Sequence, residues 1–501
     1  MKKLFLALLL CCVAMPGWAQ SKFGEKPRLV VGVVVDQMRW DYLSRYYNKF
    51  TRDGFRRLID DGFSCNNCLI NYVPTVTAIG HASVYTGTTP AFHGICGNNF
   101  YIDGHRVYCC SDENEQTVGS DSDKGRMSPR NMVATTIGDQ LRLHTDFKGR
   151  VFGVSYKDRA AILPAGHSAN AAYWLDLKNR CFITSTYYMK SLPKWFQEYN
   201  KKLQKDKDFK KLGEDIGLSP RCGAIITDMA INLLRSERLG KGDETDMLCV
   251  SYSQTDVIGH KYGTLGERTD DAYLQLDHDL GRLLRALDEQ VGRDNYLLFL
   301  TADHGAAHNW KYMQEHKVAA GPWRVNEMKE RIYEAISNDS GEDGGYIGDI
   351  MDYRIFLDWE MIRSRGLITA DMEHQVLWEV QKEPDIAFAT VYKDLATSAL
   401  PPLLKERALM GYYPGRSGDI VFFPRPGYYE SGSWNEPTGT THGEWNPYDA
   451  HIPCLFFGWR VPHGATSRQV SITDIAPTVC QLLHIQQPDA CTGQSIVEIT
   501  K

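Results

Sequence analysis

The chain has 501 residues, of which 43% are hydrophobic and 24% are charged, and its formal net charge is −6. This length allows one large α/β domain with insertions or about three average domains, and the composition is ordinary for a globular core. The net negative charge gives no basic footprint for nucleic acid, so we expect no nucleic-acid binding, and an anionic substrate would need a locally positive site.

The N-terminal segment 1–19 has the features of a secretory signal peptide. Lys2 and Lys3 precede a short apolar run, and small residues up to Ala19 form a cleavage site. The apolar run is too short to cross a bilayer, and a buried N-terminal helix is the weaker alternative. We therefore expect a periplasmic or secreted protein, cut after Ala19, with no stable membrane insertion once the signal is removed.

Several apolar, β-branched runs predict buried strands, with helical patterns at 129–143 and 269–291 between some of them. The runs are 29–35, 150–155, 247–251, 296–300, 420–423 and 452–457. Such alternation predicts an α/β fold with a mostly parallel central sheet and helices on both faces. In such sheets ligands gather at the carboxyl ends of the strands.

One catalytic domain, residues 20–501, is expected to contain an insertion. The stretch from about 308 to 415 separates the candidate site residues, and we predict a cap-like insertion there. Its aromatic side chains, among them Trp310 and Trp323, could cover a site. They could equally well form the core of the insertion itself.

The cysteines permit disulfides without specifying them. Removal of the signal peptide leaves eleven of the thirteen cysteines, so at least one stays unpaired. Cys65-x-x-Cys68 and the vicinal Cys109-Cys110 resemble half-sites for zinc. A disulfide or a buried thiol is the commoner state of such cysteines in an oxidising compartment. The pairing cannot be read from the sequence.

Acidic and histidine residues follow two of the predicted strands. Asp36 ends the first strand, and Asp303 and His304 follow the run at 296–300. An unpaired carboxylate at the end of an apolar strand is costly, so Asp36 needs a cation or a salt bridge, for example to Arg39. Asp303 and His304 are adjacent and can bind one ion only where the chain turns, which Gly305 allows.

Three further residues are of the same chemical type. Asp256 and His260 are four residues apart, which on a helix places both side chains on one face, within reach of one ion. His442 lies in a Gly-Thr-Thr-His-Gly loop. Each of these residues alone is readily explained as a surface or solvated group. Together with Asp36, Asp303 and His304 they supply about the number of donors that two metal ions need.

A threonine-bearing turn, PTVTAIGH at residues 74–81, offers a nucleophile. A hydroxyl is a poor nucleophile unless a base or a metal ion lowers its pKa. On chemical grounds Thr75, Thr77 and the nearby Ser83 all remain candidates. A structural threonine that is hydrogen-bonded to its own turn is the alternative.

Three polar residues could bind a phosphoryl group. Asn98 offers an amide donor on a glycine-rich turn, and Lys157 and Arg159 follow the predicted strand at 150–155. Two residues apart, Lys157 and Arg159 would share one side of an extended segment. Guanidinium and ammonium groups both suit phosphoryl oxygens. An exposed charged turn would explain the same pair.

These segments together resemble the alkaline phosphatase superfamily, and within it the phosphate-irrepressible, PafA-type bacterial alkaline phosphatases. In chain order the matching motifs are VVVDQMR at Asp36, PTVTAIGH at Thr77, HGICGN at Asn98, KDRAAILPAGH at Lys157, DVIGH at Asp256, TADHG at Asp303 and THG at His442. They span nearly the whole mature chain. Sulfatases of the superfamily need a Cys/Ser-x-Pro-x-Arg motif, which this turn lacks.

The resemblance implies a role for each residue. One zinc ion would be held by Asp256, His260 and His442. A second would be held by Asp36, Asp303 and His304, with Thr77 as its further ligand and as the nucleophile. Asn98, Lys157 and Arg159 would bind the phosphoryl oxygens. The implied function is hydrolysis of small phosphate monoesters by two zinc ions through a phosphothreonine intermediate.

Two other functions stay open. A phosphodiesterase or nucleotide pyrophosphatase of the same superfamily would also use a threonine and an asparagine, whereas Lys157 and Arg159 favour a doubly charged monoester. A non-catalytic exported zinc- or phosphate-binding protein would not need a nucleophile. The natural ester, the oligomeric state and regulation by phosphate cannot be read from the sequence.

Overall fold

The computed structural model describes residues 25–340 and 345–501. The predicted signal peptide at 1–19 therefore lies outside the described residues. None of the helices in the described part combines the length and the apolar character that a membrane crossing needs.

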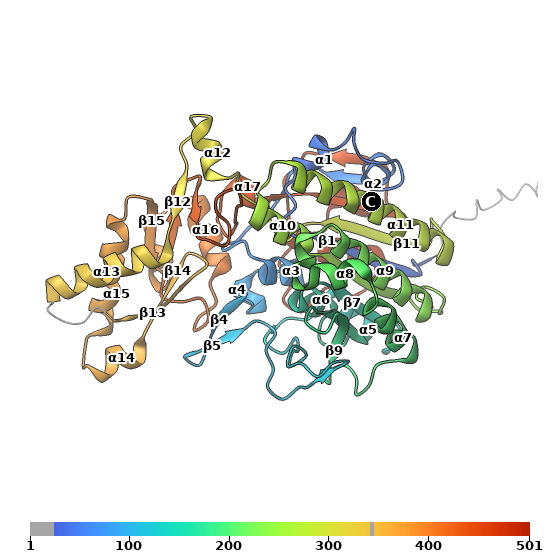
Figure 1. The fold of residues 1–501 in the computed structure, drawn as a ribbon, viewed down its shortest axis with the longest axis horizontal. Coiled ribbons are helices and arrows are strands. Elements are labelled where there is room, and N and C mark those ends of the chain that lie inside the picture. Colours follow the sequence, from blue (N-terminus) through green and yellow to red (C-terminus); the bar gives the residue numbers. More distant parts are fainter. Residues whose placement is uncertain (1–24, 341–344) are drawn as a thin grey trace, which may run out of the picture.

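A ten-stranded sheet forms the centre of the molecule, in the order β20-β2-β19-β11-β1-β10-β7-β8-β9-β6. Its outer strands include β20 (Gly464–Thr466) and β2 (Phe63–Cys65) at one edge and β9 (Cys181–Ser185) and β6 (Thr117–Val118) at the other. In its middle β1 (Leu29–Val35) pairs in parallel with both β10 (Asp246–Tyr252) and β11 (Tyr296–Thr301). The parallel order continues through β7 (Val151–Ser155) to β8 (Ala171–Asp176). Helices cover both faces (Figure 1). The predicted α/β fold with a mostly parallel central sheet is confirmed.

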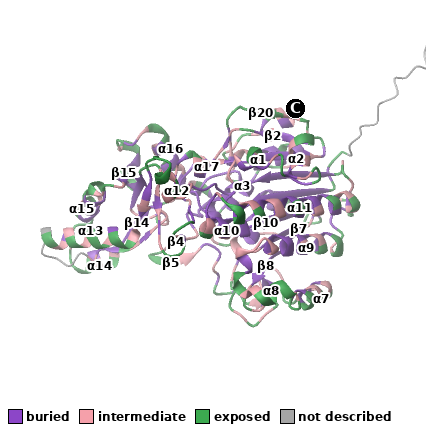
Figure 2. Cartoon of the chain, turned by 45° about the horizontal axis from the view of Figure 1, so that its top comes forward, coloured by how far each residue is buried: buried purple, intermediate pink, exposed green. Residues whose placement is uncertain are grey.

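The central strands are continuous apolar runs because both of their faces are covered. Every residue of β1, β7, β10 and β11 is buried. Figure 2 shows these strands as the buried middle of the larger lobe. Towards one edge the direction changes, since β19 (Cys454–Gly458) runs antiparallel to β11.

A second lobe carries its own antiparallel sheet, at the left of Figure 1. The strand order is β13 (Ile347–Met351), β14 (Arg354–Leu357), β16 (Ile420–Pro424) and β15 (Ile386–Val391). Helices α13 (Val325–Ser340) and α15 (Thr369–Lys382) supply apolar side chains to the core of this lobe. The apolar run at 420–423 forms a strand here and not in the central sheet, because composition predicts a strand but not its partners. This lobe thus extends beyond residue 415.

Of the two predicted helical segments, one is a helix over nearly its whole length and the other only in its second half. The pattern at 269–291 corresponds to α11 (Glu267–Gln290), whereas the pattern at 129–143 is helical only in α5 (Ile137–His144). A capping box explains the late start: the Thr136 hydroxyl accepts a hydrogen bond from the Asp139 N–H, and the Asp139 carboxylate accepts one from the Thr136 N–H.

The eleven cysteines of the described chain are all free thiols, and all but Cys491 are buried. The Sγ atoms of Cys109 and Cys110 lie 4.0 Å apart without a bond between them. The disulfides that an exported location would permit are thus not formed in this structure.

Candidate active site

The carboxyl ends of three neighbouring parallel strands bring the candidate ligands together. Asp36 follows β1 and Asp303 follows β11, while β10 leads into α10 (Gln254–Tyr262), which carries Asp256. Because these strands are parallel and adjacent, residues that follow them meet at one edge of the sheet. His442 reaches the same place from the loop between β17 (Tyr428–Glu430) and α17 (Pro447–Ala450).

Asp36, Asp303 and His304 form the first donor group. The three side chains are buried, and one donor atom of each lies within 4.8 Å of the others. His304 Nε2 is 3.4 Å from Asp36 Oδ1 and 3.4 Å from Asp303 Oδ2. These three atoms have no hydrogen-bond partner in the described structure. Buried, unpartnered donors and acceptors are costly, so this group fits a metal cation.

Asp256, His260 and His442 form the second donor group. Asp256 Oδ1 lies 3.1 Å from His260 Nε2 and 3.5 Å from His442 Nε2. The other ring nitrogens face backbone carbonyls, with His260 Nδ1 2.9 Å from the Thr440 oxygen and His442 Nδ1 2.7 Å from the Thr75 oxygen. An N–H on Nδ1 leaves a lone pair on Nε2, the arrangement found in metal-binding histidines.

The pKa shifts differ between the histidines: burial would lower the pKa of His260, but the charge of Asp256 outweighs burial and raises it. Burial lowers the pKa of His304 to about 3 and holds the pKa of His442 well below its ordinary value. Both imidazoles are therefore neutral, which is the form that binds metal. Burial, together with the charge of Asp36, raises the pKa of Asp303 well above its ordinary value. Carboxylates crowded in this way need positive charge nearby.

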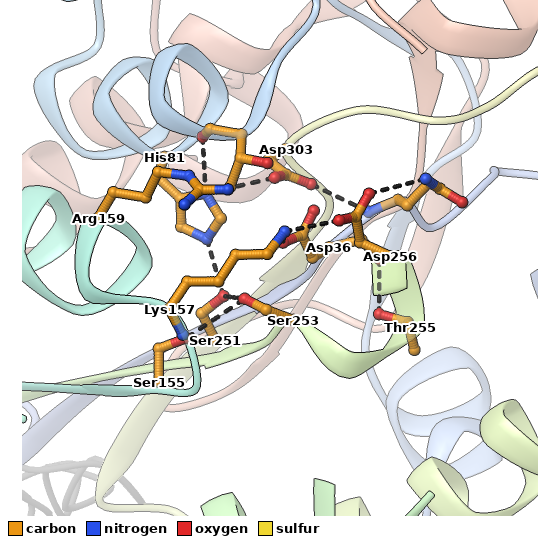
Figure 3. Close-up of polar contacts among 12 residues, drawn as sticks. Asp36, His81, Ser155, Lys157, Arg159, Ser251, Ser253, Thr255, Asp256 and Asp303 are labelled. Carbon is orange, nitrogen blue, oxygen red and sulfur yellow. Dashed lines mark hydrogen bonds and ion pairs between the residues drawn. The ribbon is translucent and has the colours of Figure 1, made fainter. Parts of the chain in front are cut away.

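Lys157 supplies one positive charge between the two groups. Its Nζ lies 2.7 Å from Asp36 Oδ2 and 2.6 Å from Asp256 Oδ2, as Figure 3 shows. The residue caps α6 (Asp158–Ala165), directly after β7. Burial would lower the pKa of Lys157, but the charges of Asp256 and Asp36 outweigh burial and raise it. The ammonium group therefore stays protonated.

Arg159 is placed differently from the sequence interpretation. It lies in the first turn of α6 and not on an extended segment shared with Lys157. Its Nη1 donates to the Tyr108 hydroxyl at 3.1 Å, and that hydroxyl in turn donates a hydrogen bond to the Asp158 carboxylate. Its buried Nε has no partner in the described structure. The guanidinium is thus held in place with donor capacity left for an anion.

Thr77 stands out among the three candidate hydroxyls. It is the first residue of α3 (Thr77–Thr86), and the Ala78 N–H next to it donates to Asn98 Oδ1 at 3.1 Å. The Thr75 hydroxyl instead donates to the Glu444 carbonyl at 2.8 Å, and the Ser83 hydroxyl is hydrogen-bonded to His93 at 3.0 Å. Thr75 and Ser83 are therefore engaged in holding the structure.

Sequence reasoning assigned no role to Gln37, which supports both donor groups. Its N–H donates to Asp303 Oδ1 at 3.1 Å and its side-chain amide donates to Asp256 Oδ1 at 2.7 Å. The backbone φ of 63° is rare for a residue other than glycine. Its only signal in the sequence is its position next to Asp36, because nothing local marks this conformation.

His81 also had no predicted role, although it ends the PTVTAIGH motif. Its Nδ1 lies 2.9 Å from the Thr77 carbonyl and 3.4 Å from Asp303 Oδ2, and its Nε2 lies 2.8 Å from the Ser251 hydroxyl (Figure 3). Burial lowers its pKa to about 4, so the ring is neutral. His81 therefore links the threonine turn to the first donor group.

Two glycines allow close approach at the site. A Cβ on Gly80 would lie 2.3 Å from the Asp303 carbonyl oxygen, so α3 can pack on Asp303 only with glycine here. A Cβ on Gly305 would lie 2.2 Å from the Tyr448 carbonyl oxygen. Gly305 does not have a positive φ. Asp303 and His304 do share one donor group, but Gly305 serves that arrangement by close packing and not by a positive φ.

Two cavities border the site. One of about 560 Å³ is lined by Asn98, His260 and His442 among others, and one of about 430 Å³ borders Lys157 and Arg159. The site is thus accessible to a small molecule from two sides.

Comparison with known proteins adds independent findings. A sequence profile of the family "Type I phosphodiesterase / nucleotide pyrophosphatase" matches residues 30–447. The chain is 40% identical, over 98% of its length and 97% of the other, to a Myroides odoratus protein named calcium-transporting ATPase. It is also 40% identical to alkaline phosphatase PafA of Elizabethkingia meningoseptica, over 99% of both chains.

A solved structure shows the same similarity in three dimensions. The crystal structure of wild-type alkaline phosphatase PafA superposes with a TM-score of 0.91 at 40% identity, over 95% of this chain and 100% of that one. A variant of the same enzyme, with one threonine, one asparagine, one lysine and one arginine substituted, superposes with a TM-score of 0.90 at 39% identity, over 95% and 99% of the two chains.

Proposed function

Because this chain belongs to the type I phosphodiesterase / nucleotide pyrophosphatase family and, within it, to the PafA-type alkaline phosphatases, we propose that it is an exported two-zinc enzyme. It hydrolyses phosphate monoesters through a phosphothreonine intermediate. The observation that carries the proposal is the grouping of two buried donor sets around one threonine turn. A lysine and an arginine stand beside them.

The residues present fit two zinc ions. Asp256, His260 and His442 would hold one ion. Asp36, Asp303 and His304 would hold the other, together with Thr77. Three protein ligands of carboxylate and imidazole type with one open position are typical of catalytic zinc. When bound, zinc would lower the pKa of the threonine hydroxyl and balance charge on the reacting oxygens.

The chain's own residues account for the course of the reaction. The Thr77 oxygen attacks phosphorus, so a threonine–phosphorus bond forms while the bond from phosphorus to the leaving alcohol breaks. Water then attacks the phosphothreonine, which releases inorganic phosphate and restores the hydroxyl. Asn98, Lys157 and Arg159 would stabilise the phosphoryl oxygens by charge and hydrogen bonds. His81 would hold the Thr77 backbone in position.

Two observations support these assignments. The four residue types substituted in the crystallised PafA variant are the types of Thr77, Asn98, Lys157 and Arg159. Lys157 and Arg159 also favour a monoester over a diester, because a monoester dianion carries one more negative charge on its phosphoryl group.

The direct test compares p-nitrophenyl phosphate with bis-p-nitrophenyl phosphate on the purified, zinc-loaded protein. We expect kcat/KM for the monoester to exceed that for the diester by orders of magnitude. A preference for the diester would establish the phosphodiesterase alternative. Turnover of neither ester would establish a non-catalytic binding protein.

The export part of the proposal rests on residues 1–19. If the signal peptide is cleaved as expected, N-terminal sequencing of the protein from the periplasm or the medium should begin at Gln20. Recovery of the intact N-terminus from the cytoplasm would contradict export.

A further inference from the structure

The cavity of about 560 Å³ is distinctive in the charge of its walls. Carboxylates of Glu214, Asp215, Asp352 and Glu430 line it, against a single lysine, Lys261, and no arginine among its lining residues. It opens directly on His260 and His442 of the second donor group. The acidic walls therefore face the proposed reaction centre and do not belong to a separate surface patch.

Most of these carboxylates are not neutralised within the protein. Asp352 accepts a hydrogen bond from Arg354 at 3.1 Å. No lysine or arginine in the described part of the chain forms an ion pair with the side chains of Glu214, Asp215 or Glu430. Burial and the charge of Asp352 raise the pKa of Glu430 to about 7, so its carboxylate is ionised at alkaline pH.

Aromatic rings complete the wall. Trp434 lines the cavity, is 45% exposed, and meets the His260 ring edge-on with the ring centroids 5.3 Å apart. Tyr353 lines the cavity too. A cation that is placed over an indole or phenol ring is attracted by the ring's negative face. Unpaired carboxylates and the partly exposed indole ring of Trp434 therefore favour the same kind of ligand, an organic cation.

The position of the cavity indicates which part of a substrate it would receive. In the proposed reaction the alcohol leaves on the side of phosphorus opposite Thr77. Of the proposed phosphoryl ligands, Lys157 and Arg159 border the other cavity, and Asn98 lies where the acidic cavity meets the reaction centre. The acidic cavity, beside His260 and His442, then remains for the leaving alcohol.

We propose that this cavity binds the leaving alcohol and selects positively charged alcohols, so that the enzyme's preferred substrates are phosphate monoesters of quaternary ammonium or protonated amino alcohols. The inference rests on the proposed function. Glu430 and Glu214 are its specificity-determining residues, and Trp434 supplies the aromatic surface. Alcohols that carry further negative charge, such as a second phosphate, are disfavoured by the same walls.

The test uses two esters of nearly identical shape, phosphocholine and its uncharged isostere 3,3-dimethylbutyl phosphate. Their alcohols differ in acidity as well as in charge, so the decisive quantity is how the ratio of their kcat/KM values changes between enzyme forms. The forms are the zinc-loaded wild type, the double variant Glu430→Gln with Glu214→Gln, and the control Glu198→Gln. Glu198 is an exposed carboxylate on α7 (Lys194–Leu203), outside the cavity.

The double variant should lower the ratio by about tenfold, since each partly exposed charge interaction changes binding by up to about fivefold. The control variant should leave the ratio unchanged. The wild-type ratio should also fall as ionic strength rises from about 0.01 M to about 1 M, because salt screens charges at the cavity wall. This second measurement keeps the inference testable if the double variant does not fold.

A ratio that stays the same in the double variant, or that does not change with salt, would overturn the inference. Hydrolysis of p-nitrophenyl phosphate, measured alongside, distinguishes a failure of the proposed selectivity from a failure of the proposed function. If it is hydrolysed while the ratio is constant, only the selectivity for cationic alcohols fails. If it is not hydrolysed by the wild type, the proposed function fails as well.

Discussion

The imidazole rings of His304 and His442 stack on each other, with their centroids 3.4 Å apart and an interplanar angle of 13°. One ring belongs to the donor group of Asp36 and the other to the donor group of Asp256. Burial lowers the pKa of both histidines, so two neutral rings meet without charge repulsion. The stack therefore brings the two donor groups into one reaction centre.

Removal of metal should abolish activity and also weaken the fold. A strong zinc chelator should stop hydrolysis of p-nitrophenyl phosphate, and added zinc should restore it. Metal analysis should find about two zinc ions per chain, as two-metal hydrolases require. Since an ion that binds only the native state stabilises it, the metal-free protein should have a lower Tm. Full activity of the metal-free protein would refute the metal assignment.

Thr77→Ala should lose several orders of magnitude in kcat, because the attacking oxygen is removed. Thr77→Ser should keep substantial activity, since a hydroxyl remains. Thr75→Ala should cost about 1–3 kcal/mol of stability through its lost hydrogen bond to Glu444, yet it should retain most of the activity, as should Ser83→Ala. Acid quenching during turnover and peptide mass mapping should locate phosphate on Thr77. Phosphate on another side chain would contradict the assignment.

The double substitution Lys157→Ala with Arg159→Ala should reduce monoester kcat/KM far more than diester kcat/KM. Each charge-assisted contact is worth roughly 1.5–3 kcal/mol, or about one to two decades in rate if it is fully expressed in the transition state. Lys190→Ala, which removes an exposed lysine between β9 (Cys181–Ser185) and α7, is the matched control. Equal losses for both esters would mean that these two residues support structure and do not recognise charge.

Gly80→Ala should disturb the site through packing alone. The added Cβ would lie 2.3 Å from a backbone oxygen of Asp303, which cannot move aside cheaply, so α3 must shift. Overpacking of this kind costs about 1–3 kcal/mol, and kcat should fall because α3 carries Thr77. Gly242→Ala is the control, since no atom lies within 4 Å of its Cβ position. Wild-type Tm and kcat for Gly80→Ala would show that the helix tolerates the shift.

Asp139→Asn should destabilise the protein at neutral pH but not in acid. Burial would raise the pKa of Asp139, yet His167 and hydrogen bonds from Ser168 outweigh burial and lower it to about 2. A carboxylate with a lowered folded-state pKa stabilises above its unfolded pKa and loses that effect as pH falls through the folded value. Burial would lower the pKa of His167, but Asp139 outweighs burial and raises it, so the full interaction needs His167 protonated. The difference in unfolding free energy between wild type and variant should therefore be largest near about pH 5, at about 2 kcal/mol.

Below about pH 4 the same difference should shrink. Chemical denaturation of both proteins across this range measures it. A difference that grows as the pH falls below about 4 would contradict the sign of the effect.

The sequence by itself determined the fold class and the likeness of the site to a known chemistry. Apolar runs such as 29–35 and 296–300 are buried strands whatever their partners, because strands covered on both faces have such composition. Polar residues directly after such strands, such as Asp36 and Asp303, can then be expected at one edge of a parallel sheet. These inferences need only local composition and chain order.

Only the tertiary structure decided the features that depend on contacts between distant segments. It places 420–424 in the second sheet, and it puts Lys157 Nζ between Asp36 and Asp256. It also shows Gly80 pressed against Asp303. None of these has a local signature, because strand partners, ion-pair distances and close backbone approaches are set by packing between residues far apart in the chain.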